Sequence, residues 1–157
     1  MLTPTLHLLR HRSVSIGRLS LTARNISNMA IEGTNSSPTL LYANKTFRSQ
    51  SNTSNGEVSA STTFRYNQDA QNPHIVWAEY SGGSITRGFL IATVQEDQSL
   101  DARYQHVNED GELRTGMCRS MPEVLEDGRV RLNEKWKWTS GDGSSGESVV
   151  EEVREGT

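Results

Sequence analysis

The chain has 157 residues, with 16 Lys and Arg against 19 Asp and Glu, a formal net charge of -3 and a mean hydropathy of -0.63. A single cysteine excludes an internal disulfide framework and a cysteine-rich zinc site, and no apolar stretch approaches the roughly 18 residues of a membrane helix. The length fits one soluble domain with a small core.

Residues 1–31 form a basic leader without acidic residues. On a helical wheel, Leu8, Leu9, Ile16 and Leu19 share one side, and an Arg-rich, Ser-containing amphipathic leader is typical of an organellar transit peptide. This interpretation predicts a mitochondrial protein. The alternative is an upstream extension, with Met29 as the effective start and a cytoplasmic location. Residues 32–40 have the composition of a linker, so the domain is expected at 41–157.

From Tyr42 onward the chain alternates between β-branched or aromatic stretches and turn residues, a pattern typical of strands. Short turns favour antiparallel neighbours, and closure of eight strands removes the exposed edges. The prediction is an all-β, eight-stranded antiparallel up-and-down barrel of the lipocalin or calycin type, with a two-sheet β-sandwich as the alternative. The expected strands lie near 42–48, 57–67, 74–80, 85–95, 99–107, 112–120, 129–139 and 147–154.

Alternation within each strand predicts the inward faces. In 129–139, Glu134, Trp136 and Trp138 share a face, and Lys and Arg alternate with them, so the Trp face is expected inside. A tight hairpin at 108–111 places a second set of residues inside: Leu100, Ala102, Tyr104, His106, Leu113, Met117 and Arg119. A two-residue Gly-Gly turn at 82–83 then places Trp77 and Glu79 inward and Arg87 outward.

An apolar interior with a few convergent polar groups is typical of a small-molecule site. The predicted function is therefore the binding of a small ligand inside the barrel, by the residues Glu79, Tyr104, His106, Glu134, Trp77, Trp136, Trp138 and Arg119. One alternative is that the same polar groups close a network that fills the barrel. Another is an enzyme, in which a pair of carboxylates or His106 acts as acid and base.

The sequence shows no ligand spacing for a metal and no phosphate-binding glycine loop, so neither a metal nor a cofactor is expected. Cys118 is expected on the outer face without a base beside it, which does not support a nucleophilic triad. The oligomeric state is left open.

The predicted outer faces also carry a basic stripe, formed by Arg103, Arg114, Arg129, Arg131, Lys135 and Lys137. Such a stripe is suited to an acidic partner, which makes an interaction module a further alternative. Nucleic acid is not the expected partner, because the Trp residues that would stack on bases point inward. Cross-strand pairing of the stripe with nearby acids is the simpler interpretation.

Residues 42–153 resemble a group of small, mainly bacterial proteins labelled N-acetylglutamate synthase. The resemblance rests on Asn55-Gly56-Glu57-Val58-Ser59, Ala78-Glu79-Tyr80-Ser81-Gly82-Gly83, Arg103-Tyr104-Gln105-His106, 122–129, 133–138 and Gly146-Glu147-Ser148. It implies one compact β domain, and the label implies an acetyl-transfer enzyme. The resemblance supplies no catalytic residues to transfer to this chain.

Overall fold

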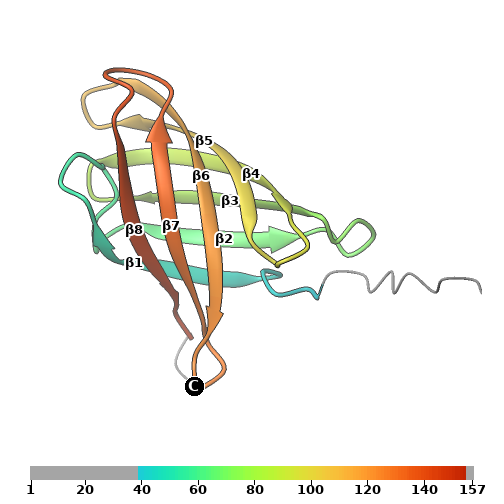
Figure 1. Ribbon diagram of the computed structural model, residues 1–157. Helices are drawn as coiled ribbons and strands as arrows, with labels where there is room; N and C mark the ends of the chain where they lie inside the picture. Colours follow the sequence, from blue (N-terminus) through green and yellow to red (C-terminus); the bar gives the residue numbers. More distant parts are fainter. Residues whose placement is uncertain (1–38, 155–157) are drawn as a thin grey trace, which may run out of the picture. The chain divides into compact units, whose positions relative to one another are not determined.

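A computed structural model describes residues 39–154, which form a closed antiparallel β-barrel (Figure 1). The leader 1–31 and the linker up to residue 38 lie outside the described residues. The strands are β1 (Lys45–Asn52), β2 (Thr63–Gln68), β3 (Ile75–Gly82), β4 (Ile85–Val94), β5 (Leu100–Asn108), β6 (Leu113–Val124), β7 (Val130–Trp138) and β8 (Ser145–Glu152).

Each strand pairs with its sequence neighbours, and β1 pairs with β8 to close the ring. The closing register matches Phe47 with Glu152 and contains a bulge between Ser49 and Ser51. The predicted eight-stranded antiparallel up-and-down barrel is therefore confirmed, and the sandwich alternative is wrong. No helix among the described residues is long and apolar enough to span a membrane.

One end of the barrel is filled by a packed core. Phe47, Phe64 and Tyr66 form an aromatic cluster, with the ring centroids of Phe47 and Tyr66 5.0 Å apart. Tyr42 covers this end and is itself fully buried; its backbone N–H donates to Gln68 Oε1 at 3.0 Å. The opposite end, where the loops β1–β2, β3–β4, β5–β6 and β7–β8 lie, is called the mouth below.

Strand β6 faces the opposite way from the sequence prediction. The expected hairpin paired His106 with Leu113, but His106 pairs with Arg114 instead. The reason is the turn, in which Gly111 has a φ of 79° and Asn108 N–H donates to Glu112 O, so the loop holds one residue more than a tight turn. A shift by one residue reverses every side chain, so Leu113, Met117 and Arg119 point outward.

Strand β3 is reversed for a similar reason. Gly82 pairs with Ile85, but a register shift between Tyr80 and Gly82 then places Tyr80 opposite Gly88. That shift turns Val76, Ala78 and Tyr80 inward, where all three are buried. Trp77 and Glu79 therefore lie on the outer face, contrary to prediction, whereas Arg87 lies outside as expected.

The inward faces predicted for β5 and β7 are confirmed. On β5, Leu100, Ala102 and His106 are buried, and on β7 so are Trp136 and Trp138. Apart from Val107, the outward positions of both strands carry charged or amide side chains, and this alternation fixes the register against the core.

Candidate functional site

A cavity of about 50 Å³ lies inside the barrel toward the mouth, and every strand contributes to its lining. Its walls are mostly aromatic, with Phe64, Tyr80, Tyr104, Trp136 and Trp138 around it. The polar groups that face it are few: the side chains of Asn52, Glu57, His106, Cys118, Glu134 and Ser148.

Glu134 is the buried carboxylate of this cavity. Ser148 Oγ donates to Glu134 Oε2 at 2.7 Å and Ser120 Oγ donates to Oε1 at 3.1 Å. Burial raises the pKa of the Glu134 carboxyl above its ordinary value, although the two serine hydrogen bonds oppose the change. Among residues 39–154 no Lys, Arg or His forms an ion pair with it. The carboxyl therefore has hydrogen-bonding capacity left over.

The aromatic walls are shaped by glycines on neighbouring strands. Trp136 pairs with Gly146 across β7 and β8, and a Cβ atom on Gly146 would lie 2.7 Å from a Trp136 ring carbon. The indole of Trp138 meets that of Trp136 with ring centroids 5.6 Å apart. Because glycine leaves room beside it, Trp136 lies along the barrel wall.

Cys118 lies inside the barrel, against the sequence prediction, because the register of β6 is shifted. Burial raises the pKa of its thiol well above the ordinary value, with Glu134 nearby as a second cause. Only the thiolate is a strong nucleophile. The thiol is therefore a lining group that stays protonated.

His106 is held by protein groups at both ring nitrogens. Its Nδ1 lies 3.1 Å from Tyr80 Oη, and its Nε2 lies 2.8 Å from Glu57 Oε2. The Tyr80 hydroxyl also lies 3.2 Å from Gln105 O, an acceptor that fixes the phenol. With both nitrogens engaged by Tyr80 and Glu57, His106 offers no free ring nitrogen to act as a base.

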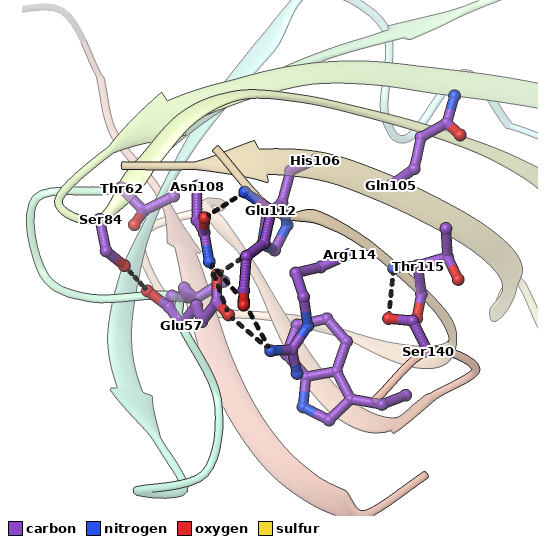
Figure 2. Close-up of polar contacts among 12 residues, drawn as sticks. Glu57, Thr62, Ser84, Gln105, His106, Asn108, Glu112, Arg114, Thr115 and Ser140 are labelled. Carbon is purple, nitrogen blue, oxygen red and sulfur yellow. Dashed lines mark hydrogen bonds and ion pairs between the residues drawn. The ribbon is translucent and has the colours of Figure 1, made fainter. Parts of the chain in front are cut away.

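Glu57 is a site residue that the sequence reasoning did not assign. A strand was expected near 57–67, but β2 begins at Thr63, so Glu57 lies in the loop between β1 and β2, where no alternation indicates which way a side chain points. Figure 2 shows its carboxylate beside Asn108 and Arg114, and Arg114 Nη1 lies 3.3 Å from Glu57 Oε1. Arg114 was predicted on the outer basic stripe, but its guanidinium lies at the mouth over the Trp138 ring, 4.5 Å from the centroid.

The structure brings together five of the eight predicted site residues: Tyr104, His106, Glu134, Trp136 and Trp138. The other three predicted residues do not line the cavity. Trp77 is 41% exposed on the outer face, Glu79 lies 3.6 Å from Arg87 outside the barrel, and Arg119 Nη2 lies 3.0 Å from Asp97 on the surface.

The remaining cations of the predicted basic stripe mostly have acidic neighbours. Arg131 lies 2.7 Å from Glu151, Arg103 lies 2.6 Å from Asp101, and Arg129 lies 2.6 Å from Asp127. These ion pairs agree with the expected pairing of the basic stripe with nearby acids, within a strand, in a turn or across strands. The described residues contain no group of three or more His, Cys, Asp or Glu side chains arranged to hold a metal.

Comparison with known families agrees with this architecture. The family model described as avidin-like protein matches residues 40–153, which covers the whole barrel. The chain belongs to the avidin-like protein family. No curated protein and no solved structure matches it.

The avidin-like assignment accounts for the barrel, since this family has a calycin-type fold. It gives no support to the label N-acetylglutamate synthase, so that resemblance is unconfirmed. Avidin-like barrels bind small ligands such as biotin.

Proposed function

We propose that this avidin-like barrel binds a small organic ligand whose polar head carries N–H donors and contacts Glu134. The observation that carries the proposal is a buried carboxyl group, held by two serines, that faces an aromatic cavity and forms no ion pair within residues 39–154. A buried carboxylate that is not paired with a cation is costly to keep. A ligand head with N–H groups supplies further donors to it.

The walls support the same proposal. Tyr104, Trp136 and Trp138 offer ring faces and edges to a flat or aliphatic group, with Tyr104 and Trp138 in an edge contact at 5.6 Å between centroids. Aromatic side chains contribute large contact areas with little loss of conformational freedom. The head of the ligand is therefore expected at Glu134 and its apolar part against Trp136 and Trp138.

The size of the cavity limits the ligand. Sites for drug-sized molecules measure roughly 300–1,000 Å³, and this cavity measures about 50 Å³. A compact head fits this space as it stands. A larger ligand needs the β1–β2 loop, which lines the cavity through Gly56, Glu57 and Val58, to move.

The first test is mass spectrometry of the full chain purified from cells, under native and then denaturing conditions. Extra mass that is lost on unfolding identifies the ligand directly. In parallel, biotin and a series of small amines, guanidines and ureas are titrated while Trp fluorescence is followed. Bare protein in the first measurement together with no saturable change in the second would overturn the proposal.

The second test uses a matched pair of variants. Glu134→Gln should weaken ligand binding by about tenfold or more, since hydrogen bonds to a charged group contribute about 1.5–3 kcal/mol. Glu79→Gln, which removes an exposed carboxylate on the outer face, should leave the affinity unchanged. Equal affinity in both variants would rule out Glu134 as the contact.

A further inference from the structure

The ten-residue loop 53–62 between β1 and β2, called the strap below, closes part of the mouth. Its two ends are bonded to neighbouring strands and loops, and three hydrogen bonds hold its middle to the barrel: Ser84 Oγ donates to Glu57 O at 3.2 Å, Asn52 Nδ2 donates to Val58 O at 2.9 Å, and Trp138 Nε1 donates to Asn55 O at 3.2 Å. These contacts turn the side chain of Glu57 toward the barrel interior. The Glu57 side chain is 19% exposed.

Three side chains from β5 and β6 surround the Glu57 carboxylate. His106 Nε2 lies 2.8 Å from Oε2, Arg114 Nη1 lies 3.3 Å from Oε1, and Asn108 Nδ2 donates to Oε1 at 3.4 Å. An imidazole, a guanidinium and an amide around two carboxylate oxygens form the donor set that recognises a carboxylate.

This donor set is positioned by groups other than Glu57. His106 is fixed through Nδ1 and Tyr80 Oη, and Asn108 Oδ1 accepts from Glu112 N–H at 2.9 Å. Arg114 stacks on the ring of Trp138. The three donors would therefore keep their places without the strap carboxylate, as a preorganised site requires.

Glu57 does not satisfy all the hydrogen-bond donors of the Arg114 guanidinium. The contacts of Arg114 with Glu57 and Glu112 measure 3.3 and 3.6 Å, longer than the about 2.7–2.9 Å of a charge-assisted hydrogen bond. The buried Arg114 Nε has no hydrogen-bond partner among the described residues. A carboxylate that is not tethered to the strap is free to approach the guanidinium more closely.

We propose that His106, Asn108 and Arg114 form a carboxylate-binding site at the mouth, which the chain fills with its own Glu57. A small carboxylate competes with Glu57 for these donors, and when it wins it releases one anchor of the strap. The site goes beyond the proposed function, because its ligand group is an anion bound at the mouth and not a donor bound at Glu134.

The test is an acetate titration of the full-length Glu57→Ala variant at low ionic strength, with the Trp138 indole N–H and the Arg114 Nε–H followed by NMR. We expect a saturable change that acetamide does not produce. The wild-type protein should bind acetate at least about tenfold more weakly, since acetate must first displace Glu57. No saturable change in the variant, or an equal effect of acetamide, would overturn the proposal.

Two further variants make the result specific. Glu57→Ala combined with Arg114→Met should lose the acetate response, and a retained response would show that acetate binds elsewhere. If Glu57→Ala does not fold, Glu57→Gln replaces it, because the amide keeps the shape of the side chain and removes its charge. The readout lies at the mouth, so acetate binding can succeed or fail independently of ligand binding at Glu134.

Discussion

The phenol ring of Tyr104 lies over Gly116, its cross-strand partner on β6, so closely that no Cβ atom fits between them. The same arrangement recurs where Tyr80 lies over Gly88 and where Trp136 lies over Gly146. In each pair the ring covers the neighbouring strand instead of crossing the barrel. The cavity is the space that these rings leave between them.

Replacing Gly116 with alanine should therefore destabilise the barrel. The new Cβ would overlap the Tyr104 ring and lie 2.8 Å from the carbonyl oxygen of Lys137, and overpacking of this kind costs about 1–3 kcal/mol. The free energy of unfolding in urea measures the loss. Met117→Ala, at an exposed position of the same strand, is the control and should change stability by less than about 0.5 kcal/mol.

Gly111 should tolerate asparagine better than alanine. Its φ of 79° is left-handed, a conformation that costs most residues about 1–2 kcal/mol and asparagine less. No heavy atom lies near its Cβ position, so backbone strain alone separates the two variants. Equal unfolding free energies for Gly111→Ala and Gly111→Asn would contradict the role of this turn.

Trp136 and Trp77 should differ sharply when each is replaced with alanine. Trp136 is 8% exposed inside the barrel, whereas Trp77 is 41% exposed outside it. Removal of a buried Trp side chain costs about 3–5 kcal/mol, and loss of one cross-strand neighbour costs about 1 kcal/mol or less. Urea unfolding of the two variants side by side tests the inward and outward assignments directly.

Glu134 should make stability depend on pH. Burial raises its pKa, so the folded protein keeps this proton to a higher pH than the unfolded chain does. The free energy of unfolding therefore falls as pH rises from the ordinary carboxyl range through the raised pKa, and the full contribution is present below that range. Glu134→Gln should flatten this part of the profile.

The measurement is urea unfolding of both proteins between acidic and neutral pH. Glu79→Gln serves as the control for removing one carboxylate, since its side chain is exposed on the outer face, and it should keep the wild-type profile. Parallel curves for the wild type and Glu134→Gln would show that the carboxyl does not titrate as expected.

The sequence was sufficient for the fold class and for part of the site, for a reason visible in β7. There Lys135 and Lys137 alternate with Trp136 and Trp138, so only one register hides the apolar rings. In β3 both faces are apolar enough to be buried, and alternation does not choose between them. The face that is buried is decided by a register shift beside Gly82, where β4 has one residue more than β3 between two successive pairs. This shift places Trp77 and Glu79 on the outer face.

Glu57, the site residue that the sequence did not predict, lies in the strap. The position of Glu57 depends on contacts with Ser84, His106 and Arg114, which come from a loop and two strands distant in the chain. A loop has no repeating pattern that relates sequence to direction, so its inward carboxylate could not be foreseen. Arg114 was predicted on the outer face for a different reason. The turn at Gly111 holds one residue more than expected, and this reverses the direction of every side chain on β6.

The closure of the ring also governs how the chain folds. Lys45 Nζ and Glu152 Oε1 lie 2.7 Å apart across the β1–β8 seam although 107 positions separate them in the chain. Forming a hairpin between neighbouring strands costs little loop-closure entropy. Forming the β1–β8 seam costs more, because it brings distant segments of the chain together. Barrels with such non-local pairings fold in milliseconds to seconds. Until β1 meets β8, both strands present open hydrogen-bonding edges, which makes the unclosed sheet the species most exposed to aggregation.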